Sequence, residues 1–268
     1  INIIHGGKHG EGNVNIQEFL VIPATSKNYS ESLSLGSNVY FSLKKILENN
    51  NLSTLVGLEG GFSPKLSTNQ DALLLIKQAI EESNLRVGFD MFIGIDAASD
   101  NFYLENKYNI KDKANTLTNK ELIEFYKLVN DQYHLLYLED GLSEDDWEGW
   151  HELFLAMSSQ TIIAGDDLTA TNPLRLQIAL AKKAINAIII KPNQIGTVIE
   201  ALAVSEMAKE AGIKVIVSHR SGETNDDFIA DFSVAISADY VKFGAPVRGE
   251  RVSKYNRLLQ IEKQIASL

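Results

Sequence analysis

Residues 187–193 read AIIIKPN, so that a lysine stands directly behind three isoleucines. An unbroken run of β-branched residues of this length is typical of a strand that is buried on both faces of a sheet. Such a strand would ordinarily pass into a turn, whereas Lys191 places a charge at its end. The sequence therefore raises the question of what lies beyond this strand.

Apolar runs of similar length recur along the chain, and helical stretches separate most of them. These runs are NIIHGG (2–7), QEFLVIP (17–23), VGFDMFIGID (87–96), HLLYLED (134–140), TIIAGDD (161–167), AIIIKPN (187–193), KVIVSH (214–219) and YVKFGA (240–245). Strands that alternate with helices in this way are typical of a parallel sheet. Two helical segments, residues 28–50 and 70–83, lie between the second and third strands and interrupt the alternation. We therefore predict one domain, residues 1–268, with an α/β fold: a TIM-like barrel of the ββαα(βα)6 type.

Capping residues mark the ends of several predicted helices. Thr118 and Glu121 form a capping pair at the start of one helix. Asn172 and Pro173 occupy the cap and the first helical position of another. Gly212 follows the last residues of a third helix, where glycine commonly ends one. These local signals support the helices between the predicted strands.

Composition narrows the classes of function. The sequence contains no cysteine, so a metal would have to be held by carboxylates, histidines or carbonyl groups. A net charge of −10 argues against nucleic acid as a partner. The apolar runs fall well short of the roughly 20 residues that a membrane-spanning helix needs, and we expect no membrane span. Composition favours a small ligand that is held through a cation.

Six successive predicted strands end in an ionisable side chain. These side chains are Asp96, Glu139, Asp166, Lys191, His219 and Lys242. A single lysine at a strand end would more often only extend into solvent. In a closed barrel the carboxyl ends of parallel strands meet at one mouth, which is where barrel enzymes build their active sites. Six consecutive cases therefore predict a convergent polar site.

Three carboxylates on neighbouring predicted strands favour a metal site. Asp96, Glu139 and Asp166 offer the hard oxygen ligands that Mg²⁺ prefers. Helix capping or loop solvation is the alternative for each carboxylate, and we assign Asp167 to it. Lys191 and Lys242 would face the cation. A lysine whose pKa is lowered by a nearby cation can act as a base.

Two further motifs add an acid and an anion clamp. LEGGFSP (58–64) places Glu59 in a glycine-flanked turn between the two helices, where it would be free to swing over the mouth. An exposed loop glutamate is the simpler interpretation of this residue alone. SHRSGET (218–224) places Arg220 and Ser221 at a strand end, where they can hold phosphate or a carboxylate. A lysine base and a glutamic acid together would remove a proton and expel a leaving group.

Taken together, these motifs resemble a known family. LEGGFSP (58–64), GDDLTATNP (165–173), KPNQIGT (191–197) and SHRSGETNDDFIADF (218–232) are similar, in order and spacing, to the carboxyl-terminal barrel domain of enolase, phosphopyruvate hydratase. The resemblance extends from about His5 to Leu259. It implies a lyase of glycolysis and gluconeogenesis that dehydrates 2-phospho-D-glycerate to phosphoenolpyruvate with Mg²⁺. It also implies a cytoplasmic protein, with surface display known in the family.

The resemblance implies a role for each residue of the site. Lys191 would take the proton from carbon 2 of the substrate, and Glu59, assisted by Glu18, would protonate the departing hydroxyl. Lys242 and the metal would hold the enolate. The implied Mg²⁺ ligands are Asp96, Glu139 and Asp166. The implied contacts to substrate and to the mobile loops are His9, Glu18, Arg220, Ser221, Lys242 and the catalytic His219.

Several residues depart from the family pattern. Leu58 stands where Asp is usual, Gly141 replaces the usual Pro, and His5 replaces the customary Asn. Gln260 stands where we expect an arginine that pairs across a homodimer interface. The family also carries an amino-terminal capping domain whose serine-bearing loop completes a second Mg²⁺ site with the substrate. We expect that domain to be absent from these 268 residues. It would act in cis, as part of a longer polypeptide, or as a separate subunit.

Two other functions stay open. The first is a non-catalytic, enolase-like binding or scaffold protein, although the chain ends in QIASL (264–268) and lacks the terminal lysine linked to plasminogen binding. The second is another acid dehydratase of the enolase superfamily, which SHRSGET (218–224) argues against because it carries the phosphate clamp. The presence of both lysines, the glutamic acid and the metal ligands favours 2-phosphoglycerate dehydration.

Overall fold

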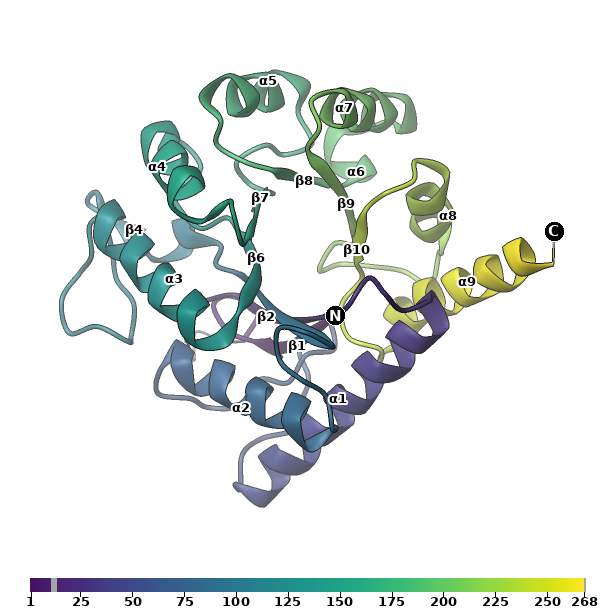
Figure 1. The fold of residues 1–268 in the computed structure, drawn as a ribbon, viewed down its shortest axis with the longest axis horizontal. Coiled ribbons are helices and arrows are strands. Elements are labelled where there is room, and N and C mark those ends of the chain that lie inside the picture. The colour runs from purple at the N-terminus through teal and green to yellow at the C-terminus, as the bar shows by residue number, and fades with distance from the viewer. Residues whose placement is uncertain (11–13, 268) are drawn as a thin grey trace.

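The computed structural model describes residues 1–10 and 14–267, and at its centre an eight-stranded sheet curls into a nearly closed barrel (Figure 1). In spatial order the strands are β1 (Asn2–His5), β2 (Glu18–Pro23), β3 (Met91–Asp96), β6 (Leu135–Glu139), β7 (Ile162–Gly165), β8 (Ala187–Ile190), β9 (Lys214–Ser218) and β10 (Tyr240–Lys242). The Asn2 N–H donates to the Gly244 carbonyl at 3.3 Å, which brings β1 next to the end of β10. The predicted α/β barrel is therefore confirmed.

β2 runs antiparallel to both of its neighbours, whereas the adjacent pairs from β3 to β10 are parallel. The expectation of a parallel sheet is therefore wrong for β2. The cause is the pair of helices that follows, α1 (Tyr29–Asn49) and α2 (Asn69–Glu82), which pack side by side and return the chain to the end of the sheet that it left. A single crossover helix would have produced a parallel strand. The reversal pairs Glu18, at the start of β2, with Asp96, at the end of β3.

Helices surround the barrel (Figure 1). After α1 and α2 they are α3 (Asn119–Tyr133), α4 (Trp147–Met157), α5 (Pro173–Lys182), α6 (Pro192–Ile195), α7 (Val198–Glu210), α8 (Phe228–Ala235) and α9 (Gly249–Ala266). The loop after β3 also holds a 3₁₀ turn (Ser99–Phe102) and a small hairpin, β4 (Tyr103–Leu104) and β5 (Lys107–Tyr108). Within residues 1–10 and 14–267, no helix is long and apolar enough to cross a membrane.

The predicted helix caps form as expected. The Thr118 side chain accepts from the Glu121 N–H, and the Glu121 carboxylate accepts from the Thr118 N–H. Asn172 caps α5, and Pro173 is its first residue. Gly212 lies just beyond α7 with a φ of +73°, a conformation that glycine adopts without strain. The bounds of α1 and α2 lie within one residue of the predicted segments.

Alternation along β8 explains the direction of Lys191. Ile189 belongs to the apolar cluster inside the barrel, whereas Ile188 and Ile190 belong to the larger core between the sheet and the helices. Because successive side chains of a strand point to opposite faces, Lys191 follows Ile189 in pointing toward the barrel axis. The charge at the end of AIIIKPN is therefore directed into the mouth of the barrel.

Candidate active site

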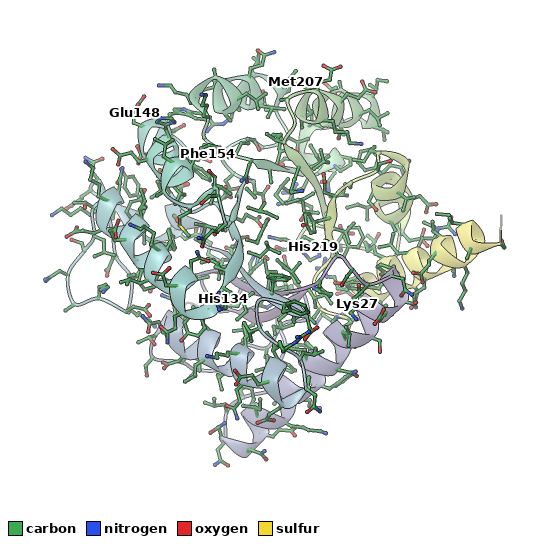
Figure 2. All side chains as sticks on the ribbon, in the orientation of Figure 1. Lys27, His134, Glu148, Phe154, Met207 and His219 are labelled. Atoms are coloured by element: carbon green, nitrogen blue, oxygen red, sulfur yellow. The ribbon has the colours of Figure 1, made fainter. Side chains whose placement is uncertain are left out.

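A polar cavity opens where the strand ends meet. Its lining includes nearly every side chain that the sequence predicts for the site. Those residues are His9, Glu18, Glu59, Asp96, Asp166, Lys191, His219, Arg220, Ser221 and Lys242. Glu139 does not line the cavity, but it is fully buried and contacts Lys242. Figure 2 shows His219 beside β10 at the barrel opening.

Lys242 forms the centre of an ion-pair network. Its Nζ is close to three carboxylate oxygens: Glu139 Oε2 at 2.7 Å, Glu18 Oε2 at 2.9 Å and Asp96 Oδ2 at 3.0 Å. Glu18 can take part because β2 is reversed and begins at this mouth. Burial alone would lower the pKa of Lys242, but the carboxylates raise it well above its usual value. The raised pKa favours the charged form of Lys242 within this network.

Lys191 is the second lysine of the mouth, and it pairs with Asp166. Its Nζ donates to Asp166 Oδ2, and both side chains are largely buried. Burial acts to lower the pKa of Lys191, but the charge of Asp166 outweighs burial and the pKa is raised. The expected lowering of this pKa depends on a cation beside Lys191 and stays a prediction. The pKa of Lys191 would fall only if the Asp166 carboxylate interacted with another partner.

The carboxylates of the mouth fit a divalent cation. Ligand oxygens lie within 4.8 Å of one another in two groups, Asp96 with Glu139 and Asp140, and Asp140 with Asp166 and Asp167. Glu139 Oε1 and Asp166 Oδ1 are buried and have no hydrogen-bond partner among the described residues. Burial raises the pKa of Asp96 to about 6 and also raises the pKa of Glu139. A cation bound by oxygen ligands would satisfy these two unpaired atoms. The predicted ligand set of Asp96, Glu139 and Asp166 draws on both groups and stays a prediction.

Asp140 is a residue of this cluster that the sequence analysis did not assign. Its Oδ1 accepts from the Asp166 N–H at 3.0 Å, and its Oδ2 accepts from the Asp167 N–H at 2.8 Å. Both oxygens are engaged, so Asp140 holds the end of β7 in place. Its signal in the sequence is the acidic pair Glu139 and Asp140 at a strand end. Asp167 is exposed, but it also lines the cavity, and its assignment to loop solvation stays a prediction.

Tyr137 is a second contact that the sequence analysis missed. Its side chain lies in the apolar cluster inside the barrel, and its hydroxyl donates to Glu139 Oε2 at 2.5 Å. Burial and the neighbouring Glu139 raise the pKa of Tyr137 well above its usual value, so that the hydroxyl keeps its proton. Gly94 gives this ring its space, because a Cβ there would lie 3.0 Å from the Tyr137 Cβ. Tyr137 therefore orients a predicted metal ligand from below.

Glu59 is buried and held from several sides. Its Oε1 accepts from Ser221 Oγ at 2.8 Å, and its Oε2 accepts from Asn2 Nδ2 at 3.1 Å. The turn is also fixed, because the Ala245 N–H donates to the Glu59 carbonyl at 2.8 Å and Gly60 has a φ of +89°. Only 3 % of the Glu59 surface is exposed. The expectation that Glu59 swings over the mouth is therefore wrong.

His219 faces Glu59 with a defined tautomer. Arg251 Nη1 lies 2.7 Å from His219 Nδ1 and donates to it, so the proton of the neutral ring lies on Nε2. That nitrogen is 3.3 Å from Glu59 Oε2. Burial lowers the pKa of His219, which keeps the ring neutral. Burial would raise the pKa of Glu59, but His219 outweighs it and holds this pKa well below its usual value.

His9 and Ser221 complete the contacts on this side. Because the Ser221 hydroxyl donates to Glu59, it accepts from His9 Nε2 at 3.0 Å. His9 Nδ1 lies 3.3 Å from Glu18 Oε1. Burial acts to lower the pKa of His9, but its contact with Glu18 outweighs burial and the pKa is raised. Glu18 therefore links His9 to the ion pairs around Lys242, since its other oxygen contacts Lys242.

Arg251, on α9, ties the loops of the mouth together and was not assigned from the sequence. Its side chain is fully buried, and its guanidinium donates to the carbonyls of Arg220, Ser221 and Leu58 at 2.7, 2.7 and 3.2 Å. These partners lie at least 30 positions away in the sequence. No local pattern could therefore have indicated them. Leu58 has its own side chain exposed, so its departure from the family pattern leaves the turn around Glu59 intact.

The fold and the mouth define an α/β barrel with an acidic site suited to a divalent cation and to acid–base chemistry. The family model described as "Enolase, C-terminal TIM barrel domain" matches residues 1–268, and the chain belongs to this family. Members of the family typically bind Mg²⁺, in agreement with the carboxylate groups described above. Membership indicates an enolase or another dehydratase of the enolase superfamily.

Proposed function

We propose that this mouth dehydrates 2-phospho-D-glycerate to phosphoenolpyruvate. The observation that carries the proposal is that Lys191, Glu59 and the Arg220–Ser221 pair line one cavity. They correspond to a base, an acid and an anion clamp, which are the functions that proton removal and loss of a hydroxyl group require.

Lys191 would accept the proton from carbon 2 of the substrate on its Nζ. It must first lose its own proton, which pairing with Asp166 opposes. Asp166, together with Asp96 and Glu139, would hold Mg²⁺, which when bound would neutralise their charge and stabilise the enolate oxygens. With Asp166 so engaged, burial and the neighbouring Lys242 would lower the pKa of Lys191 toward that of a usable base.

Glu59 would give a proton to the hydroxyl on carbon 3, so that the carbon–oxygen bond breaks and water leaves. Its pKa is low in the structure because of His219, and an anionic substrate in the cavity would raise it. Asn2, Ser221 and His219 would hold the carboxyl group in place while it changes its protonation state. The low mobility of Glu59 thus favours an acid that is positioned in advance.

Arg220 and Ser221 would hold the phosphate at the edge of the cavity, and Lys242 would face the enolate. The same proposal includes a second Mg²⁺ that binds with substrate and with an amino-terminal enolase domain, in cis or as a separate subunit. It includes a place in glycolysis and gluconeogenesis, in the cytoplasm, and a homodimer or higher oligomer. These points rest on the family resemblance.

A different acid dehydratase of the superfamily is the second candidate function. The barrel, the lysines and the carboxylates would serve it equally well. The Arg220–Ser221 pair, at the rim of the cavity and beside His9, favours a phosphorylated substrate instead. A non-catalytic binding protein would have no need for two buried lysines paired with carboxylates.

The direct test is the ultraviolet absorbance of the enol ester that forms from 2-phosphoglycerate in the presence of Mg²⁺. We expect slow turnover by the purified chain and faster turnover when an amino-terminal enolase domain is added. Turnover of a non-phosphorylated 2-hydroxy acid, but not of 2-phosphoglycerate, would favour the second candidate. No turnover of either substrate with the added domain would favour a binding protein.

A further inference from the structure

Helix α9 carries two buried cations on the face that it turns toward the anion clamp. Arg251 and Lys254 are fully buried, and because they lie three positions apart they share one face of the helix. That face meets residues 219–227, which hold Arg220 and Ser221 and form the clamp loop. A buried ammonium group is costly unless it is paired. The proposed reaction gives Lys254 no part, so the reason for its burial lies in its partners.

Among the described residues, the partners of Lys254 all belong to the clamp loop. Its Nζ donates to the carbonyls of Thr224 and Asp226, both at 2.7 Å, and lies 3.0 Å from Glu223 Oε2. Three partners match the three N–H donors of an ammonium group. Lys254 therefore directs its whole hydrogen-bonding capacity to this loop.

Glu223 connects Lys254 to Arg220. Its Oε2 lies beside Lys254 Nζ, and its Oε1 accepts from the Arg220 N–H at 3.1 Å. The Arg220 carbonyl in turn accepts from Arg251 Nη1 at 2.7 Å. Helix α9 therefore holds both polar groups of the Arg220 backbone, the carbonyl directly and the N–H through Glu223.

The side chain of Arg220, in contrast, has no partner within residues 1–10 and 14–267. Arg220 is exposed and lines the cavity of the mouth. Its guanidinium offers five N–H donors, which can bind a phosphate through two parallel hydrogen bonds. A fixed backbone reduces the conformational entropy that such a contact loses, and so favours binding. The clamp loop thus presents a positioned backbone and an unpaired guanidinium to an anion.

We propose that Lys254 is a positioning residue for the phosphate group of the substrate: through Glu223 it holds the Arg220 backbone where the guanidinium meets that group. Lys254 does not itself touch the substrate. The phosphate takes no part in the bond changes at carbons 2 and 3, so its binding contributes alike to the ground state and the transition state. Loss of Lys254 should therefore raise KM for 2-phosphoglycerate and leave kcat nearly unchanged. The identity of the anion rests on the proposed function, whereas the contacts within the clamp loop do not.

Two variants break the connection at different points. Lys254→Met removes the ammonium group, whereas Glu223→Gln keeps an oxygen that can accept from the Arg220 N–H and loses only the ion pair. KM for 2-phosphoglycerate should rise by about 3-fold to 30-fold, more in Lys254→Met, which is the range for residues that act on a ligand without contacting it. The value of kcat should stay within about twofold. Lys254→Met leaves the carbonyls of Thr224 and Asp226 unpaired, so circular dichroism must show that it folds, and the half-buried Glu223 provides the test if it does not.

Arg257→Met and Asp231→Asn are the matched controls. Arg257 lies one turn after Lys254 on α9 and pairs with Asp231 on α8, with its Nε 2.7 Å from Oδ2. Among the described residues, this ion pair has no hydrogen bond to the clamp loop. Both controls should keep KM and kcat near the wild-type values, because exposed ion pairs contribute little. An equal rise of KM in the controls and in Lys254→Met would show a general effect of α9 and would overturn the proposal.

A double-variant cycle tests whether Lys254 acts through Arg220. The probe is inorganic phosphate, and its binding to the chain with Mg²⁺ is measured by phosphorus-31 nuclear magnetic resonance. Lys254→Met should weaken phosphate binding by about 3-fold to 30-fold when Arg220 is present, and by less than about twofold in Arg220→Ala. A merely structural loss would be equal in both backgrounds. Equal losses, an unchanged affinity in Lys254→Met and Glu223→Gln, or no phosphate binding by the wild-type chain would each overturn the proposal.

Activity and phosphate binding distinguish this inference from the proposed function. Weaker phosphate binding in both variants, without any 2-phosphoglycerate turnover by the wild-type chain and an added amino-terminal enolase domain, would contradict the proposed function alone. The positioning role of Lys254 would then stand. Turnover of 2-phosphoglycerate with the same KM in the wild-type chain, Lys254→Met and Glu223→Gln would do the reverse.

Discussion

The two halves of the mouth stabilise their buried polar groups in different ways. The first half, at the ends of β3, β6, β7, β8 and β10, pairs buried carboxylates with two lysines. The second half, around the end of β1, the α1–α2 turn and the end of β9, surrounds Glu59 with imidazoles and the Ser221 hydroxyl. Lysine–carboxylate ion pairs dominate the first half, whereas histidine rings and hydrogen bonds around Glu59 dominate the second.

The comparison shows how burial acts on the two kinds of group. Burial raises the pKa of the Asp96 carboxyl to about 6, and it lowers the pKa of the His5 ring to about 4. In both cases burial favours the neutral form. Carboxylates that stay charged need a cation, and neutral imidazoles offer lone pairs. The carboxylates of the first half therefore suit a hard cation.

The largest effect is expected from Lys191→Ala, which removes the proposed base from the charged half. Loss of a positioned base commonly lowers a rate by about 10²-fold to 10⁴-fold. We expect that loss in the exchange of the carbon 2 hydrogen with solvent deuterium, measured by nuclear magnetic resonance. Mg²⁺ binding and the circular dichroism spectrum should be retained. Near-normal exchange in this variant would show that Lys191 is not the base that removes the proton from carbon 2.

Asp166→Asn should weaken Mg²⁺ binding by roughly 10-fold to 100-fold, because it removes a buried charge with an unpaired oxygen. Asp167→Asn is the matched control, since Asp167 follows Asp166 directly and is exposed. It should change the Mg²⁺ affinity far less. Isothermal titration calorimetry gives both affinities. Equal losses in the two variants would mean that the wrong aspartate has been chosen.

The pH dependence of Mg²⁺ binding separates the two halves further. Asp96 has its pKa raised to about 6, so below that pH it carries a proton that Mg²⁺ must displace. Because burial also raises the pKa of Glu139, the affinity should rise by about tenfold or more per pH unit below pH 6, and each ion that binds should release one proton or more. Calorimetry in two buffers of different ionisation enthalpy measures the protons released. An affinity that is flat from pH 5 to pH 7 would contradict this assignment.

Tyr137→Phe should have the smallest effect of the four. It removes the hydroxyl that donates to Glu139 while Lys242 still contacts the same oxygen. Mg²⁺ affinity should fall by about tenfold or less, the lower end of what an outer contact contributes. Thermal unfolding of the variant tests whether the fold is preserved. A loss as large as that of Asp166→Asn would show that Tyr137 does more than orient Glu139.

Local patterns in the sequence were sufficient to predict the barrel and the residues of one half of the site. Strand length, β-branched runs and caps such as Thr118 depend on neighbours a few positions away. Alternation then directs Lys191 inward once β8 is recognised. Because parallel strand ends meet at one edge, Asp96, Asp166 and Lys191 could be placed at one mouth before their contacts were known.

The family resemblance, and not the strand pattern, brought in Glu18 and His9. Glu18 stands at the beginning of its strand, where the strand-end rule assigns it to the far side of the barrel. Its place at the mouth depends on the reversal of β2, which follows from two helices packing together between β2 and β3. A reversal of this kind depends on long-range packing.

The sequence by itself determined the kind of barrel, the helix ends and the residues that line the mouth, because these depend on periodicity and on the order of the elements. Only the tertiary structure decided that Glu59 is fixed, that Arg251 joins the loops and that Lys191 has its pKa raised by Asp166. It also brought His5 to within 4.0 Å of Glu59. Protonation and hydrogen bonding depend on distances in space and on burial, and residues far apart in the chain set both.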